Sequence, residues 1–169
     1  VVGRPHQNAR DTHVVKDQFG RSIEYLRISV TDRCNFRCQY CMPVEGLPWL
    51  PKAEILRYEE IAEIVAQLAP LGLKRIRITG GEPTIRPRLA TLIGMLRAIP
   101  GVEDISLSTN GVKLPELAAE LREAGLDRVN ISADSLQSAR VVAIARRDLG
   151  FDIVRSASAA QAAGLAPIK

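Results

Sequence analysis

The chain has 169 residues and a formal net charge of +4, with 46% hydrophobic and 25% charged residues. This composition is typical of a globular domain, and the length is sufficient for one domain. No run approaches the roughly eighteen apolar residues of a membrane span, and residues 1–10 lack the apolar segment of a secretory signal, so we expect no membrane partner. Aromatic residues make up 4%, too few for the stacking platforms that bind single-stranded nucleic acid, so we expect no nucleic-acid partner either.

Residues 1–19 are polar and show no periodicity, which predicts an N-terminal tail followed by one domain over residues 20–169. The run Phe19-Gly20-Arg21 is typical of a turn. Residues 23–30 come next. They are rich in strand-forming residues and largely alternate between apolar and polar, so they predict a first strand.

Helices and strands alternate along the rest of the chain. Periodic apolar residues such as Ile61, Val65 and Leu68 predict helices, and short β-rich runs predict strands. The predicted helices span 58–71, 89–98, 114–124, 139–145 and 153–163, and the predicted strands span 74–79, 105–108, 128–132 and the first residues of a strand at 166–169. This alternation is typical of right-handed βαβ units with a parallel sheet. We therefore predict an α/β fold, a partial parallel (β/α) barrel of about four βα units and the start of a fifth strand.

The alternating pattern stops within the fifth strand. A sheet edge left uncovered at that point would expose backbone groups that domains normally cover. We therefore expect residues 20–169 to be the N-terminal part of a larger barrel. Polar or glycine-rich residues follow each of the first four strands, and in parallel α/β folds ligands bind at that carboxyl edge.

All three cysteines of the chain lie within eight residues, at Cys34, Cys38 and Cys41. Thiolates this close can converge on one centre, either a metal ion or an iron–sulfur cluster. The same spacing also matches one face of a helix, where cysteine would act as a small core residue. Polar neighbours and Pro43 just beyond the motif disfavour that alternative, so we predict a loop that holds a metal centre. Clustered cysteines without an export signal also predict a reducing cytoplasm.

Two motifs resemble the radical S-adenosylmethionine (SAM) enzymes. These are the cysteine motif with Tyr40 before its last cysteine, and the run Gly80-Gly81-Glu82-Pro83 one strand later. The longer runs 26–38, 76–83 and 128–132 resemble the GTP 3',8-cyclase family of molybdenum cofactor biosynthesis. This resemblance covers about residues 20–169. It implies a radical SAM barrel as the fold.

The resemblance also implies the members of the active site. Cys34, Cys38 and Cys41 would ligate a [4Fe–4S] cluster, and the iron without a cysteine would bind SAM through its amino and carboxylate groups. The implied SAM contacts are Tyr40, Gly81 and Ser132. The implied GTP contacts are Arg27, Arg77, Ser108 and Lys169. We expect the two arginines, as part of the catalytic site, near the C-terminal ends of adjacent strands, where guanidinium groups can bind a triphosphate.

The implied reaction begins with cleavage of SAM to a 5'-deoxyadenosyl radical by the reduced cluster. This radical takes a hydrogen from the ribose of GTP and starts ring closure onto the guanine, which gives (8S)-3',8-cyclo-7,8-dihydroguanosine 5'-triphosphate. The implied partners are GTP, an electron donor for the cluster, and cyclic pyranopterin monophosphate synthase, which receives the product. A homodimer is compatible with the resemblance.

The sequence departs from the family pattern in three ways. Ser108 stands where the family generally has Thr, and Ala133 stands where it usually has Leu. The family also has a second three-cysteine cluster in its C-terminal region, which binds the guanine end of GTP, and these 169 residues end before it. We therefore expect weak SAM cleavage from these residues and no cyclisation of GTP.

Several alternatives remain open. Another radical SAM reaction would share the cysteine loop and the Gly-Gly-Glu-Pro turn without needing Arg27 and Arg77. A non-catalytic remnant or a zinc-holding module would use the three thiolates for a different purpose. The two glycines of the turn allow a close backbone approach or simply a tight turn. Glu82 could receive the amino group of SAM or cap the turn.

Overall fold

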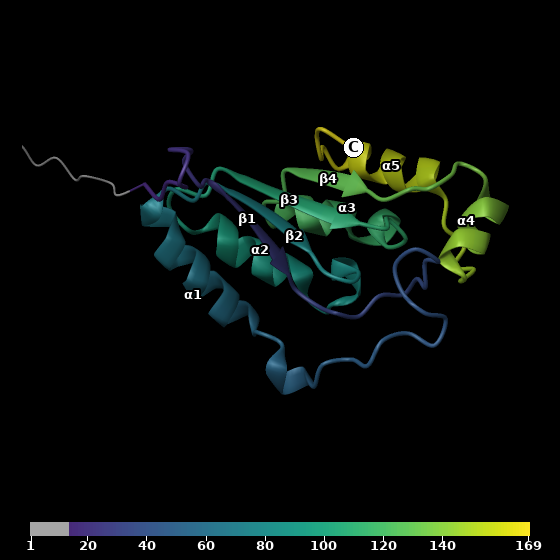
Figure 1. Ribbon diagram of the computed structural model, residues 1–169. Helices are drawn as coiled ribbons and strands as arrows, with labels where there is room; N and C mark the ends of the chain where they lie inside the picture. Colours follow the sequence, from purple (N-terminus) through teal and green to yellow (C-terminus); the bar gives the residue numbers. More distant parts are fainter. Residues whose placement is uncertain (1–13) are drawn as a thin grey trace, which may run out of the picture.

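The structure is a computed structural model that describes residues 14–169. Four parallel strands lie side by side in chain order: β1 (Tyr25–Ser29), β2 (Arg75–Thr79), β3 (Asp104–Thr109) and β4 (Arg128–Ile131). The helices are α1 (Tyr58–Leu68), α2 (Leu89–Arg97), α3 (Leu114–Glu123), α4 (Ser138–Ala145) and α5 (Ile153–Ala162). Three short 3₁₀ turns are η1 (Lys52–Glu54), η2 (Ala69–Leu71) and η3 (Pro83–Ile85). The predicted alternation of strands and helices is confirmed (Figure 1).

The first residues of the strand predicted at 166–169 also pair with the sheet. Ile168 forms a parallel bridge with Val129. The backbone N–H of Lys169 donates to the carbonyl of Val129 at 3.1 Å, and the carbonyl of Lys169 accepts from the N–H of Ile131 at 2.7 Å. The chain therefore extends the parallel sheet beyond β4, as in the early strands of a (β/α) barrel.

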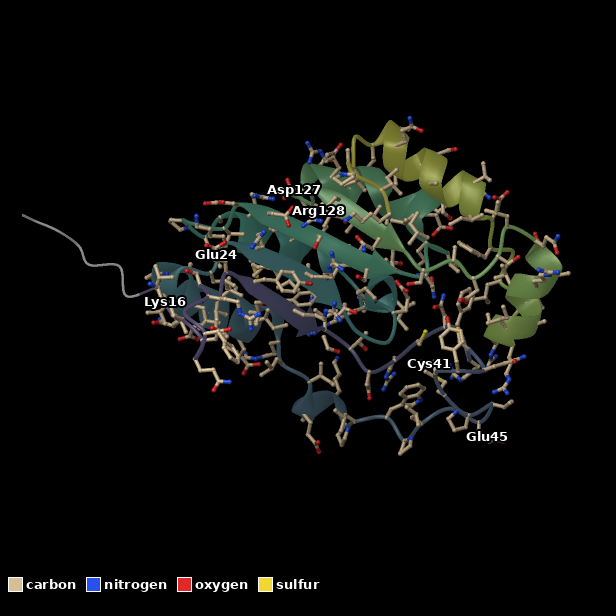
Figure 2. The ribbon with its side chains drawn as sticks, turned by 45° about the horizontal axis from the view of Figure 1, so that its top comes forward. Lys16, Glu24, Cys41, Glu45, Asp127 and Arg128 are labelled. Carbon is tan, nitrogen blue, oxygen red and sulfur yellow. The ribbon has the colours of Figure 1, made fainter. Side chains whose placement is uncertain are left out.

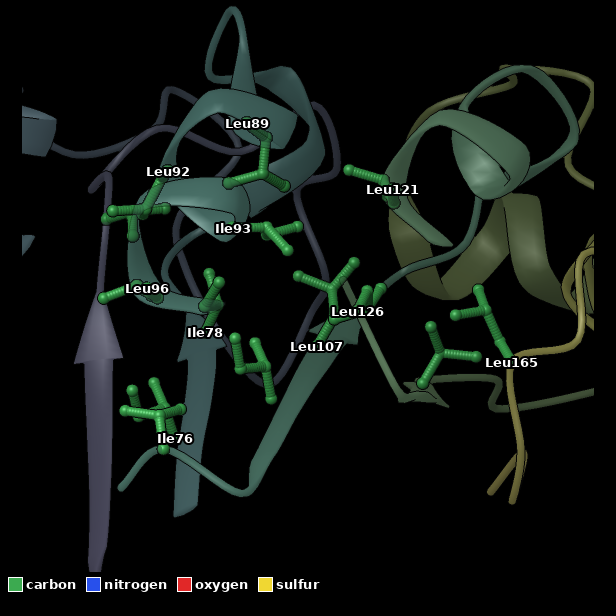
Figure 3. Close-up of a cluster of buried hydrophobic side chains, with 14 of the residues drawn as sticks. Ile76, Ile78, Leu89, Leu92, Ile93, Leu96, Leu107, Leu121, Leu126 and Leu165 are labelled. Carbon is green, nitrogen blue, oxygen red and sulfur yellow. The ribbon is translucent and has the colours of Figure 1, made fainter. Parts of the chain in front are cut away.

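The core lies between one face of the sheet and helices α1, α2 and α3. Strand residues such as Ile76, Ile78 and Leu107 are fully buried there, and they meet Leu92 and Leu96 of α2 (Figure 3). Because successive residues of a strand point to opposite faces, the residues between them face away from the helices. That second face, the inner face, is polar: it carries Arg27, Arg77 and Ser106 in one register row.

The helix predicted over 58–71 is interrupted by Pro70. The α-helix ends at Leu68, and Ala69–Leu71 continue as the 3₁₀ turn η2. Proline has no N–H to donate to the preceding turn, which explains why the regular helix stops here. Gly72 then closes the element with a positive φ of 102°, a conformation in which glycine is favoured.

The predicted tail lies mostly outside the described residues, which begin at Val14. Residues 15–23 form an antiparallel turn, in which Lys16 pairs with Ser22. The N–H of Val15 also donates to the carbonyl of Leu71 at 3.0 Å. The predicted boundary at residue 20 therefore falls inside a turn that is hydrogen-bonded to the domain. Within residues 14–169, no helix combines the length and apolarity that crossing a membrane requires.

Candidate active site at the carboxyl ends of the strands

The cysteine motif forms a loop that begins directly after β1. Residues 34–41 contain no helix, so the loop prediction is confirmed and the helix-face alternative is wrong. Cys34 and Cys38 are half-buried and Cys41 is exposed. Figure 2 shows Cys41 at the opposite end of the molecule from Lys16 and Glu24, which lie toward the amino ends of the strands.

Apolar anchors and backbone hydrogen bonds hold this loop in place. Phe36 is buried and packs edge-on against Phe151, with ring centroids 6.2 Å apart. The N–H of Arg37 donates to the carbonyl of Ala145, at the end of α4, at 2.8 Å. The Arg37 guanidinium donates to the carbonyl of Cys34 at 2.8 Å and lies 5.4 Å from the ring centroid of Trp49. These contacts fix the backbone of the loop while the thiols border a cavity.

The cavity has a volume of about 240 Å³ and lies where the strands end. Seven of the residues to which the resemblance assigns a cluster, SAM or GTP contact line it: Cys34, Cys38, Cys41, Tyr40, Gly81, Ser108 and Ser132. Residues from the ends of β3 and β4, and from α4, complete the wall; they include Asn110, Asp134 and Val141. The cysteines and the predicted SAM contacts are thus brought together around one space, although they come from distant parts of the chain.

Gly80 and Gly81 lie so close to the backbone of residues 31–33, which lead into the cysteine loop, that a side chain has no room at either position. A Cβ atom on Gly81 would lie 2.3 Å from the carbonyl oxygen of Arg33, and one on Gly80 would lie 2.6 Å from that of Thr31. The N–H of Gly81 donates to the Thr31 carbonyl at 2.7 Å. The close-approach alternative is therefore correct, and the approaching backbone is that of the chain itself.

Glu82 acts as a buried cap. Its side chain is 1% exposed and accepts four hydrogen bonds. One oxygen accepts from the N–H and hydroxyl of Thr84 and from the hydroxyl of Thr109, and the other accepts from the N–H of Asn110 at 2.7 Å. Three of the four donors share one oxygen and a single donor bonds the other, so the second oxygen keeps an acceptor site, and Glu82 lines the cavity.

This cap is connected to the cysteine loop. The side-chain amide of Asn110 donates to Oδ1 of Asn35, which follows the first cysteine, at 2.7 Å. A single network thus joins the ends of β2 and β3 to the cysteine loop through Glu82, Asn110 and Asn35. Sequence reasoning did not identify the two asparagines, because nothing in their local pattern distinguishes them from ordinary turn residues.

Cys34, Cys38 and Tyr40 are neutral in the free protein, because the pKa of each is raised. Burial raises the pKa of Cys34 and of Cys38, and negative groups nearby, including Glu82 and Asp134 respectively, act in the same direction. Burial of its hydroxyl and a hydrogen bond to Asp134 at 3.0 Å raise the pKa of Tyr40. Iron binding would therefore release protons from the cysteines.

The donor set fits an iron–sulfur cluster better than a single ion. Within residues 14–169, no three His, Cys, Asp or Glu side chains lie close enough together to share one metal ion. In a [4Fe–4S] cluster each cysteine binds a different iron, so the thiols need not share one ion. Three thiols at the edge of one cavity, with open space between them and the strand ends, meet this requirement.

Arg27 and Arg77 lie outside the cavity lining, on the inner face of the sheet. They are register partners on β1 and β2, so the predicted adjacency is confirmed. Each is the third residue of a five-residue strand, two residues before its carboxyl end. Arg77 donates to Oγ of Ser106 at 3.4 Å and lies 5.9 Å from the ring centroid of Tyr25. Lys169 lies outside the cavity lining too, at the far side of β4.

The parallel strands, the loop of three cysteines and the cavity at the strand ends define a class of protein. Residues 28–168 match the Radical SAM superfamily, so the chain belongs to this superfamily. Solved structures agree on the fold. HydG, a maturase of the [FeFe]-hydrogenase, matches with a TM-score of 0.66 and 15% identity over 85% of this chain and 33% of its own. The structure of anSMEcpe with bound AdoMet matches with a TM-score of 0.62 and 20% identity over 86% of this chain and 42% of its own.

Two curated relatives are much more similar to this chain in sequence. The chain is 52% identical over 155 residues to the GTP 3',8-cyclase of Moorella thermoacetica, a match that covers 92% of this chain and 48% of that protein. It is 51% identical over 153 residues to the GTP 3',8-cyclase of Petrotoga mobilis, covering 90% of this chain and 47% of that protein. The chain therefore spans about half the length of the curated relatives it matches.

Proposed function

We propose that this chain is the SAM-binding part of a GTP 3',8-cyclase. This radical SAM lyase converts GTP into (8S)-3',8-cyclo-7,8-dihydroguanosine 5'-triphosphate in molybdenum cofactor biosynthesis. The observation that carries the proposal is the gathering of three cysteines, Tyr40, Gly81, Ser108 and Ser132 around one cavity. The identity of about half to proteins of that name supports the choice of reaction.

The cavity residues divide into two sets in this proposal. Cys34, Cys38 and Cys41 would hold the [4Fe–4S] cluster, and Tyr40, Gly81 and Ser132 would contact SAM. When bound, the cluster and SAM supply the electron and the radical chemistry that the protein lacks. The chain itself positions the thiols through the network of Glu82, and its cavity walls shield the reacting atoms from water.

The inner face would bind the phosphates of GTP. Two guanidinium groups in register on β1 and β2 repel each other unless an anion lies between them, and within residues 14–169 neither forms a salt bridge. A triphosphate is such an anion, and guanidinium groups bind it in bidentate fashion. Ser108 and Lys169 would complete the GTP contacts. The positive net charge of +4 favours the same ligand.

The remaining partners follow from the proposed reaction. The cluster needs an electron donor, and the product would pass to cyclic pyranopterin monophosphate synthase. We place the protein in the cytoplasm, where a reducing environment keeps the thiols available for iron. A homodimer is compatible with the proposal. We also propose that these 169 residues cleave SAM weakly and do not cyclise GTP.

The decisive test is anaerobic reconstitution with iron and sulfide, followed by an assay for 5'-deoxyadenosine. We expect a cluster absorption spectrum and SAM cleavage. Absence of both would contradict a catalytic role, and zinc in place of iron in anaerobically purified protein would favour a zinc-holding module. A third result would favour another radical SAM reaction: GTP affinity that does not change when Arg27 and Arg77 are replaced by Gln.

A further inference from the structure

Asn130 lies on the inner face of β4, in a row of polar residues that crosses the sheet. The strand register places it beside Ser108 of β3. On its other side, the two backbone hydrogen bonds of Lys169 to Val129 and Ile131 set Lys169 opposite Asn130. Asn130 therefore stands between two residues that the proposed function assigns to GTP, although no role has been given to Asn130 itself.

The side chain of Asn130 carries a polar atom without a partner. Its Oδ1 is buried and accepts no hydrogen bond from any residue that the structure describes. Val129 and Ile131, on either side in the strand, pack toward the helix-covered core, so Asn130 points to the opposite, inner face. An amide oxygen buried without a donor costs folding free energy, and such groups in native proteins usually have a specific reason. A carbonyl oxygen can only accept, so its natural partner is a hydroxyl or N–H of a ligand.

The position of Asn130 indicates which part of a nucleotide it would meet. The row that contains Arg27 and Arg77 continues to Arg128, which precedes Asn130 by two residues on β4. Phosphates carry only acceptors at neutral pH and belong with the arginines, whereas ribose hydroxyls are donors. Ser108, the register neighbour of Asn130, lines the cysteine-bordered cavity. A sugar held at Asn130 would therefore lie between the phosphate-binding row and the cavity, where the proposed reaction takes its hydrogen.

We propose that Oδ1 of Asn130 accepts a hydrogen bond from a ribose hydroxyl of the bound nucleoside triphosphate. This contact fixes the sugar in its place between the arginine row and the cavity. The inference rests on the proposed function, because it takes GTP as the ligand of the inner face. It adds a residue that selects for the hydroxylated sugar and not for the phosphates.

The test is a comparison of ligands and variants by isothermal titration calorimetry on anaerobically reconstituted protein. The ligands are GTP, 2'-deoxy-GTP, 3'-deoxy-GTP, inosine triphosphate and inorganic triphosphate. We expect the wild-type protein to bind GTP about tenfold more tightly than one of the two deoxynucleotides. Asn130→Ala should bind that deoxynucleotide and GTP equally, with unchanged affinity for inorganic triphosphate. Unchanged triphosphate binding also shows that the variant is folded.

A second variant keeps the acceptor and changes the charge. Asn130→Asp should retain the preference for the hydroxyl, while its negative charge near the phosphates lowers the affinity for every ligand. A hydroxyl preference that survives in Asn130→Ala, or is absent from the wild-type protein, would overturn the inference. Selective loss of discrimination against inosine triphosphate would also overturn it, because that result assigns Asn130 to the guanine amino group. Wild-type protein that binds no GTP would refute the proposed function as well. Wild-type protein that binds GTP without a preference for the hydroxyl would refute only the role of Asn130.

Discussion

The cavity wall and the inner face of the sheet differ in how far their polar groups are satisfied. In the cavity wall, Glu82 accepts four hydrogen bonds from the protein, and Asn110 is bonded to the cysteine loop. On the inner face, Arg27 and Arg77 form no salt bridge within residues 14–169, and Oδ1 of Asn130 has no partner there. The cavity end of the site is therefore assembled by the protein alone, whereas the inner face has bonding capacity left for a ligand.

This difference suggests two kinds of mutational effect. Changes to the cavity network should damage the structure of the cysteine loop, and the loss of cofactor binding would follow from that. Changes to the inner face should leave the fold intact and alter ligand affinity.

Gly81→Ala should disrupt the cysteine loop. Its Cβ would lie 2.3 Å from the carbonyl oxygen of Arg33, where only a backbone shift can make room. We expect a loss of about 3 kcal/mol in the free energy of unfolding and little or no cluster after reconstitution. Urea unfolding and iron content measure the two effects. Gly94→Ala is the matched control, because nothing lies within 4 Å of its Cβ and alanine is the better helix former in α2. Equal stability and equal iron content of the two variants would contradict the claim that Gly81 has no room for a side chain.

Glu82→Gln should lower the free energy of unfolding, because Glu82 is a buried cap. Replacing one acceptor oxygen by an amide leaves at least one buried donor unpaired, which costs about 2 kcal/mol. Thermal unfolding measures this loss, with Glu120→Gln on the exposed side of α3 as the control. The competing role, binding of the SAM amino group, predicts the reverse pattern. Unchanged stability with weaker SAM binding would show that Glu82 is a ligand contact.

Arg27→Gln should lower the affinity for GTP about tenfold and leave stability unchanged or slightly improved. The variant removes one of two like charges in register, and it also removes a charged donor to phosphate. SAM cleavage should continue at the wild-type rate. Equilibrium binding of GTP and urea unfolding are the measurements, with Arg155→Gln, exposed on α5, as the control. A destabilised Arg27→Gln protein with normal GTP affinity would contradict the assignment of the inner face to ligand binding.

Arg128 continues the row of Arg27 and Arg77, and among the described residues it is the only one of these three arginines that forms an ion pair. Its loss of pairing should therefore affect stability. It donates to both carboxylate oxygens of Asp104, at 2.7 and 2.6 Å, and these bonds hold the pKa of Asp104 below its ordinary value. The stabilisation is therefore fully present above the ordinary pKa of about 3.9 and is lost as the pH falls through the lowered value. Asp104→Asn should cost about 1 kcal/mol at pH 7. The difference from wild type in urea unfolding should shrink toward pH 3, and a constant difference would contradict the assignment.

The fold was largely predictable because its signals are local. Alternation between β-rich and helical patterns located each element from β1 to α5, and polar residues after each strand indicated the carboxyl edge as the site. The spacing of three cysteines predicted the loop, since Pro43 and polar neighbours disfavour a helix. Pro70 was a visible signal that helix α1 would stop early, and the apolar periodicity across it concealed this.

The rest depended on contacts between distant segments. Glu82 could not be assigned from its motif, because two of its four donors come from Thr109 and Asn110, almost thirty residues away. Asn130 stood inside a run already noted for its resemblance. Only the register shows that Asn130 lies between Ser108 and Lys169, in the row next to that of Arg27 and Arg77.

We propose that Cys34, Cys38 and Cys41 hold a [4Fe–4S] cluster with one iron open to SAM. Electron paramagnetic resonance of the reduced, reconstituted protein tests it directly, by comparing spectra with and without SAM. We expect a [4Fe–4S] signal whose g-values shift when SAM is added, because a ligand binds the iron that no cysteine occupies. A cluster spectrum unchanged by saturating SAM would contradict an open iron at this site, and the absence of any cluster would contradict the claim altogether.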